Sequence, residues 1–183
     1  FSTALNGEAR TFTLENEQVK VRFSTQGGRP VQVQMKTYEA YGGGEVELLT
    51  PETSQISLVA ATSRGEVDLY ELFYSTGSQD QQIAEGDTAL VEFVANLEGG
   101  RRIRQTYRLP GEGYEIFYDL AIENASGLIQ NETLTFSWED ELRVVEQDGK
   151  ESRTRGAFKY YAVNSGIDDF TLLQGVNETE TEV

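Results

Sequence analysis

The sequence has no cysteine and no histidine among its 183 residues. The absence of cysteine excludes a disulfide framework, a thiolate nucleophile and any zinc or iron–sulfur site built on thiolates. The absence of histidine removes the side chain that most often transfers protons near neutral pH, and with it a Ser-His-Asp triad or a HExxH zinc site. We therefore expect a protein that is not an enzyme and that holds no metal or organic cofactor.

Positive charge and long apolar runs are also scarce. Fifteen Lys and Arg stand against 31 Asp and Glu, which makes the net charge −16. Such a surface repels phosphate backbones, so we expect no nucleic-acid partner. The longest apolar runs, such as residues 58–61, are far shorter than the ~20 residues that span a bilayer. The chain begins with Phe1 and a start without positive charge, so we expect no signal peptide and interpret the sequence as a segment of a longer protein.

The dominant hydrophobic period is two, which is typical of strands with one buried face. The alternation around Gly27-Gly28 predicts a hairpin whose turn holds at least one glycine at positive φ. One buried face of this hairpin is expected to carry Val19, Val21, Phe23, Val31, Val33 and Met35.

Similar short runs follow about every ten residues, with turn signals between them. Alternating faces are expected at Ile56, Leu58 and Ala60, at Ile103, Gln105 and Tyr107, at Tyr114 to Ile122, at Leu134, Phe136 and Trp138, and at Phe158, Tyr160 and Ala162. No segment has a helical stripe. The pattern predicts an all-β fold, an antiparallel β-sandwich or barrel, within a single domain over 1–183, with flexible ends at 1–11 and 174–183.

The densest acidic cluster is Glu139-Asp140-Glu141. It suggests a carboxylate pair or a calcium site, but Glu139 and Glu141 share a strand face that Asp140 cannot share. We favour a solvated strand end, and Asp168-Asp169 is a weaker candidate of the same kind. No catalytic, cofactor-binding or metal-binding residue is therefore assigned.

Two further groups of side chains have ordinary explanations. Arg101, Arg102 and Arg104 would suit an anion, but pairing with acidic groups across a strand is the commoner use, and Arg153 and Arg155 are interpreted in the same way. Aromatic residues on strands usually pack. The candidates for lining a cleft are Tyr38, Tyr41, Tyr160 and Tyr161.

Several segments together resemble one protein family. They are Leu14-Glu15-Asn16, Phe23-Ser24-Thr25-Gln26-Gly27-Gly28, Met35-Lys36-Thr37-Tyr38, Tyr107-Arg108-Leu109, Phe136-Ser137-Trp138 and Lys159-Tyr160-Tyr161. They resemble the large periplasmic domain of YidC, the bacterial inner-membrane protein insertase, in its Bacteroidetes form. The glycine pair is the most specific element of the resemblance, which covers about residues 11–170.

The resemblance implies a β-supersandwich, similar to mutarotase-like carbohydrate proteins, that is truncated at its C-terminal end here. It implies a domain on the periplasmic side of the inner membrane, in a multi-pass protein whose insertase activity resides in a transmembrane bundle outside this sequence. The implied partners are the SecDF accessory complex and emerging membrane-protein substrates.

A carbohydrate-binding or mutarotase-like module is the alternative. The resemblance implies a histidine acid and a glutamate base for mutarotase chemistry, so the missing histidine argues against catalysis but leaves sugar binding open.

Overall fold

A computed structural model describes residues 1–124, 126–130, 133–141, 145 and 147, together with the backbone of 157–162 and 166–171. It confirms the all-β prediction. The strands are β1 (Thr11–Glu15), β2 (Val19–Ser24), β3 (Arg29–Glu39), β4 (Glu45–Leu49), β5 (Ser54–Thr62), β6 (Gly65–Asp68), β7 (Gln81–Gln82), β8 (Thr88–Asn96), β9 (Arg102–Pro110), β10 (Phe117–Glu123), β11 (Leu134–Asp140), β12 (Ala157–Ala162) and β13 (Gly166–Thr171). Three single-turn 3-10 helices accompany them: η1 (Ser2–Ala4), η2 (Leu69–Glu71) and η3 (Glu98–Gly100).

The chain divides into two compact units. The first comprises Phe1–Glu39 and Glu45–Leu142, and the second comprises Ala40–Gly44 and Arg143–Val183. In the second unit, β12 and β13 form an antiparallel hairpin, with Ala157 opposite Thr171. The expected flexible end at 174–183 lies outside the described residues, as do the side chains of Phe158, Tyr160 and Ala162.

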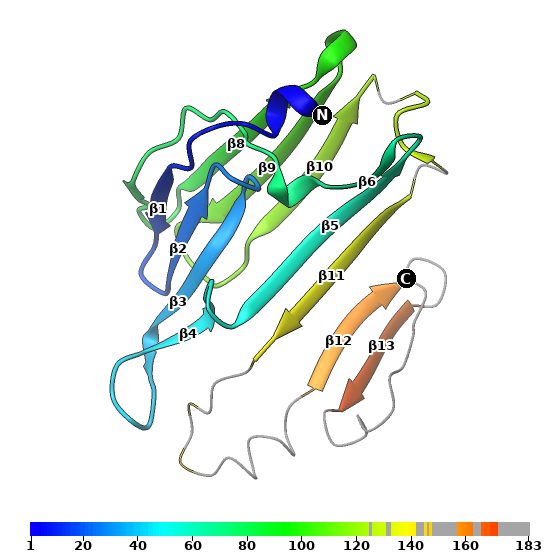
Figure 1. Ribbon diagram of the computed structural model, residues 1–183. Helices are drawn as coiled ribbons and strands as arrows, with labels where there is room; N and C mark the ends of the chain where they lie inside the picture. The colour runs from blue at the N-terminus through cyan, green and yellow to red at the C-terminus, as the bar shows by residue number, and fades with distance from the viewer. Residues whose placement is uncertain are drawn as a thin grey trace. The chain divides into compact units, whose positions relative to one another are not determined.

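Three sheets make up the first unit (Figure 1). Their strand orders are β4-β3-β2-β1-β7, β10-β9-β8 and β11-β5-β6. Neighbours are antiparallel in every described pair except β1 and β7, which run parallel over two residues. The pairing of β11 with β5 joins segments far apart in the sequence, because Trp138 lies opposite Ile56.

The hairpin of β2 and β3 has the predicted register on β2. Val19, Val21 and Phe23 are buried, and Lys20 and Arg22 between them are exposed. On β3, Val33 and Met35 lie opposite Val21 and Val19 but are only half-buried.

Val31 departs from the prediction. Arg22 pairs with Gln32 whereas Phe23 pairs with Pro30, so one extra residue of β3 forms a bulge at Val31. A bulge interrupts the alternation of faces locally. Pro30 therefore takes the place opposite Phe23 that the strict period assigned to Val31.

Aromatic rings from four strands fill the centre of the first unit. Phe12 of β1 stacks on Phe23 of β2 with 5.6 Å between ring centroids, and Phe93 of β8 lies 5.9 Å from Phe12. Tyr107 of β9 meets Phe23 edge-on at 5.2 Å. Offset and edge-on contacts of this kind stabilise beyond their buried area. They join the sheet of β1 and β2 to the sheet of β8 and β9.

The N-terminal residues, expected to be flexible, pack against this core. Ala4 in η1 is 5% exposed, and Phe1 contacts the core cluster. The backbone N–H of Phe73 donates to the carbonyl of Ala4 at 2.7 Å. The start of the chain is therefore held by the segment that follows η2.

The turn at Gly27-Gly28 has the predicted backbone. The φ angles are +82° at Gly27 and +58° at Gly28, a region that side chains with a Cβ rarely adopt. The turn is also crowded. A Cβ on Gly28 would lie 2.8 Å from Nε2 of Gln105 and 3.0 Å from Cγ of Tyr74. This glycine pair is the most specific element of the family resemblance. The structure explains the need for glycine here by backbone strain and by the lack of space for a side chain.

We expect Gly28→Val to destabilise the domain more than Gly86→Val does. Gly86 also has a positive φ, +81°, but nothing lies within 4 Å of the Cβ it would gain. Strain alone should cost about 1–3 kcal/mol at Gly86, and overpacking should add about 1–3 kcal/mol at Gly28. Urea unfolding of both variants measures the difference. Equal losses would contradict the close-packed turn described here.

Candidate functional site

An apolar groove opens on the first unit where its three sheets meet. Its volume is about 630 Å³. Its lining is apolar or aromatic except for one arginine, and consists of Arg29, Pro30, Val33, Leu48, Leu49, Ile56, Leu58, Tyr70, Tyr107, Tyr114, Ile116, Tyr118, Leu120, Phe136 and Trp138. We call this the apolar groove.

Two strands place large side chains in the apolar groove. On β11, Phe136 and Trp138 share a face because they are two residues apart, and each is 56% exposed. On β10 and the segment before it, Tyr114, Ile116 and Tyr118 share a face in the same way. The sequence predicted both faces. Monomeric proteins rarely leave such aromatic side chains together in water, and a contiguous apolar patch indicates a surface that binds something.

A buried amide lies beneath the groove. Gln105 of β9 is fully buried. Its Nε2 donates to the carbonyl of Gly27 at 2.8 Å, and its Oε1 accepts from the Tyr118 hydroxyl at 2.9 Å. This side chain therefore connects the glycine turn of one sheet to a groove residue of another.

The phenols beside Gln105 are held in their neutral form. Burial raises the pKa of Tyr74, Tyr107 and Tyr118 well above the ordinary value of about 10. The neighbouring phenol of Tyr70 raises the pKa of Tyr118 further. The guanidinium of Arg29 lies over the Tyr70 ring at 5.3 Å, a cation–π contact. At neutral pH these hydroxyls therefore act as hydrogen-bond donors and carry no charge.

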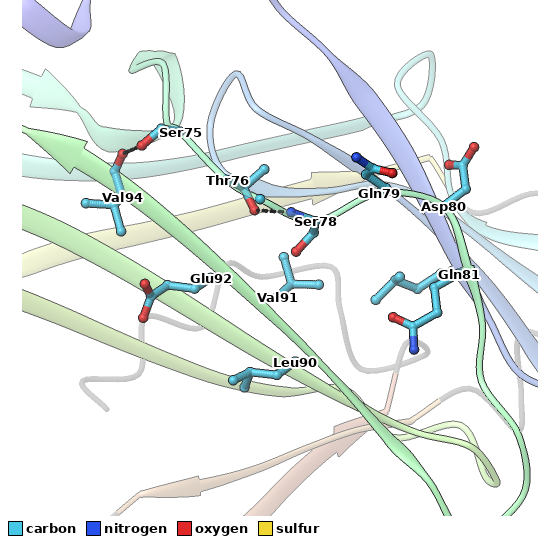
Figure 2. A pocket seen from close by; sticks show the side chains of 12 residues that line it. Ser75, Thr76, Ser78, Gln79, Asp80, Gln81, Leu90, Val91, Glu92 and Val94 are labelled. Atoms are coloured by element: carbon cyan, nitrogen blue, oxygen red, sulfur yellow. Dashed lines mark hydrogen bonds between the residues drawn. The ribbon is translucent and has the colours of Figure 1, made fainter.

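A second, polar opening lies along the edge of β8, and we call it the edge slot. Its volume is about 770 Å³, and Leu14, residues 75–81 and four residues of β8 line it. Figure 2 shows Ser75 beside Val94, with Ser78, Gln79 and Asp80 on one side of the opening and Leu90, Val91 and Glu92 on the other.

The acidic cluster is a strand end, as the favoured interpretation expected. Asp140 accepts a hydrogen bond from Ser54 Oγ at 2.8 Å, and Glu139 and Glu141 are exposed. Within the described ranges, no three carboxylates lie close enough together to hold a metal ion. Asp168 and Asp169 are on β13, where only the backbone is described.

Arg102 and Arg104 pair across strands as expected. Arg104 lies 2.8 Å from Glu123 and 3.5 Å from Glu92, and Arg102 lies 3.8 Å from Glu123. Exposed pairs of this kind contribute little stability individually. Arg153 and Arg155 lie outside the described residues.

The tyrosines selected from the sequence differ in their placement. Tyr38 lies at the rim of the apolar groove, with its ring centroid 6.1 Å from that of Tyr114. Tyr41 belongs to the second unit and is 67% exposed. The side chains of Tyr160 and Tyr161 are outside the described part. Tyr114 and Tyr118 were not selected, although their alternation with Ile116 was the signal that they share a face.

Comparison with known proteins now identifies the family. The family model for the YidC periplasmic domain matches residues 11–167. The chain belongs to the YidC periplasmic domain family. A "Membrane protein insertase YidC" of Cytophaga hutchinsonii is 32% identical over 99% of this chain and 28% of its own length. Insertases of the same name from Amoebophilus asiaticus and Parabacteroides distasonis are 26% and 27% identical over 90% and 82% of the chain.

The chain spans about 28% of the length of the first two of these YidC relatives. Within the described part of the chain, no helix is both long and apolar enough to cross a membrane. The family match confirms the resemblance drawn from the sequence and includes the glycine turn, Gln105 and the strands that form the apolar groove.

We expect Gln105→Leu to destabilise this YidC domain by about 2–6 kcal/mol. The substitution leaves the buried Gly27 carbonyl and the Tyr118 hydroxyl without their partner, and each unpaired group costs about 1–3 kcal/mol. Tyr118→Phe removes one of these groups. The double variant should therefore lose less than the sum of the single losses, as measured by urea unfolding. Strict additivity would show that the bond between the two side chains contributes nothing.

We also expect the stability of the domain to fall with rising pH above about 10. The folded state raises the pKa of Tyr107, so below pH ~10 both states are protonated and the full stability is present. Above that pH the unfolded chain loses protons first, and stability decreases towards the folded pKa. Denaturation at several pH values should give a flatter profile for Tyr107→Phe than for Tyr41→Phe, the exposed control. Identical profiles would contradict the burial of the Tyr107 phenol.

Proposed function

We propose that this YidC domain is a non-catalytic, protein-binding module on the periplasmic side of the inner membrane, and that the apolar groove receives an apolar segment of a partner polypeptide. The observation that carries the proposal is the cluster of Phe136, Trp138 and Leu48, which are each more than half exposed in a groove of about 630 Å³. Burying such surface in a complex contributes roughly 25 cal/mol per Å² before the costs of association.

The chemistry of the groove favours a polypeptide over a sugar. Sugar recognition needs free polar groups beside the aromatic rings. Here the Tyr107 and Tyr118 hydroxyls are directed at Gln105, at 3.5 and 2.9 Å. The Tyr114 hydroxyl shares a hydrogen bond of 2.7 Å with Thr37. These internal bonds leave an apolar wall, which matches apolar side chains better than sugar hydroxyls.

The family membership supplies the context for the partner. The relatives are named membrane protein insertases, and the substrates of such a protein are rich in apolar segments. We propose that the groove contacts an emerging substrate segment, and that the SecDF complex, which the family resemblance implied, is a second partner of the domain. The insertion activity itself is proposed to reside in the rest of the full-length protein.

The single tryptophan of the chain allows a direct test. Trp138 is 56% exposed in the groove, so its fluorescence should shift to shorter wavelength and resist iodide quenching when a soluble peptide with alternating leucines is added. Phe136→Ser should weaken this response, because it removes an aromatic wall of the groove. Leu5→Ser is the matched control, since Leu5 is a 49% exposed leucine that lines neither the apolar groove nor the edge slot.

Three outcomes would contradict the proposal. They are a response to oligosaccharides but not to the peptide, an equal loss of response in both variants, and a Trp138 that iodide cannot reach in the free chain. For the full-length protein, Phe136→Cys can be placed in a background from which any cysteines outside this chain have been removed, and treated with a maleimide; the chain itself has no cysteine. Labelling that is lost only while a substrate is being inserted would support substrate as the occupant.

A further inference from the structure

The free edge of β8 forms one wall of the edge slot. In the sheet of β10, β9 and β8, β9 is the middle strand, so β8 has a partner on one side only over most of its described length. On its other side, described β8 residues form a single isolated β-bridge, in which Val94 exchanges two hydrogen bonds of 2.9 Å with Ser75. Backbone groups alternate sides along a strand. The N–H and C=O groups of Leu90 and Glu92 therefore point away from β9 and into the slot.

The opposite wall is held apart from β8. The guanidinium of Arg10 donates to the carbonyls of Ser78 and Thr76 at 3.0 and 3.2 Å. The N–H of Thr13 donates to Asp80 at 2.7 Å. These bonds, and the parallel pairing of β7 with β1, fasten residues 76–82 to the β1 side. The segment diverges from β8 after the Ser75–Val94 pair (Figure 2). It cannot close on β8 without breaking the hydrogen bonds to Arg10 and Thr13 and the pairing with β1.

We propose that the edge slot receives an extended, basic segment of a partner protein, which adds to β8 as a further strand. An exposed strand edge is a template for such pairing, and its alternate side chains set the specificity. Leu90, 63% exposed, would contact an apolar side chain of the incoming strand. Glu92 and Asp80 line the slot and favour lysine or arginine on that strand, and Arg104, 3.5 Å from Glu92, offsets only part of this negative charge.

Charge complementarity selects this occupant over a second copy of the chain. Two copies would each carry a net charge of −16 over the whole chain and would each present Glu92 at the shared edge, and like charges across an interface suppress association. A basic segment is instead attracted to the slot. The proposal adds a second site to the proposed protein-binding function, and the two sites lie on different strands and have different readouts.

Amide hydrogen exchange of the 183-residue chain provides the test. The amides of Leu90 and Glu92 should exchange fast in the free chain, whereas those of Val91 and Phe93, which pair with β9, should exchange slowly. A short peptide that alternates valine with lysine should slow exchange at Leu90 and Glu92. The same peptide with N-methyl groups on its pairing face, or with glutamate in place of lysine, should not.

Variants of β8 complete the experiment. Leu90→Pro removes only an N–H that faces the slot, a place where edge strands tolerate proline, so the domain should remain folded while peptide affinity falls roughly tenfold. Glu92→Lys should reverse the preference between the lysine and glutamate peptides. The Trp138 response of the apolar groove should be unchanged in both variants, which separates a failure of this site from a failure of the proposed function.

Several results would overturn the inference. Slow exchange at Leu90 and Glu92 in the free chain at all concentrations would mean that the edge is already paired within the chain. Protection that appears with protein concentration and without peptide would make a second copy the occupant. An equal response to the N-methylated peptide would show that no strand is added.

Discussion

The buried amide of Gln105 is the interaction on which the described first unit depends most. It fills hydrogen-bonding positions on two sheets at once, at the Gly27 carbonyl and at the Tyr118 hydroxyl. Its Nε2 lies only 2.8 Å from the position that a Cβ on Gly28 would take. The glycine in the turn of one sheet and the long side chain of Gln105 in the other therefore depend on each other. A buried amide whose N–H and C=O groups are hydrogen-bonded in this way fixes the relative position of the two sheets. If the sheets slid past each other, these polar groups would remain buried without hydrogen-bond partners.

That arrangement also prepares the apolar groove. Because Gln105 accepts from Tyr118, the phenol presents its ring and not its hydroxyl to the groove. Burial keeps the neighbouring phenols neutral, so no phenolate disturbs an apolar ligand. The polar core and the apolar surface of this YidC domain are therefore linked through one tyrosine. The edge slot is built differently, from backbone groups that β8 leaves unpaired on the side away from β9.

Local patterns in the sequence were sufficient to predict the strands and, for most strands, which face is buried. The alternation of Val19, Val21 and Phe23 predicted their burial, and two adjacent glycines predicted a turn with positive φ. Alternation was insufficient at Val31, because a bulge depends on how two strands pair and not on either strand alone. It placed Gln105 on a buried face but not its partners, which come from turns and strands distant in the sequence. The exposure of Trp138 depends on what covers that face of its sheet, and periodicity carries no information about that.

The pairing of β11 with β5 has a consequence for how the protein is made. Ser54 and Asp140, which share a hydrogen bond, are 86 positions apart. During synthesis, β5 therefore lacks this partner strand until a long further stretch of chain has been made. Contacts of such high sequence separation slow folding, and the strand edge that waits is a site for wrong pairing. This domain, which belongs to a family of insertases, would therefore itself pass through an incompletely folded state that needs protection from wrong pairing.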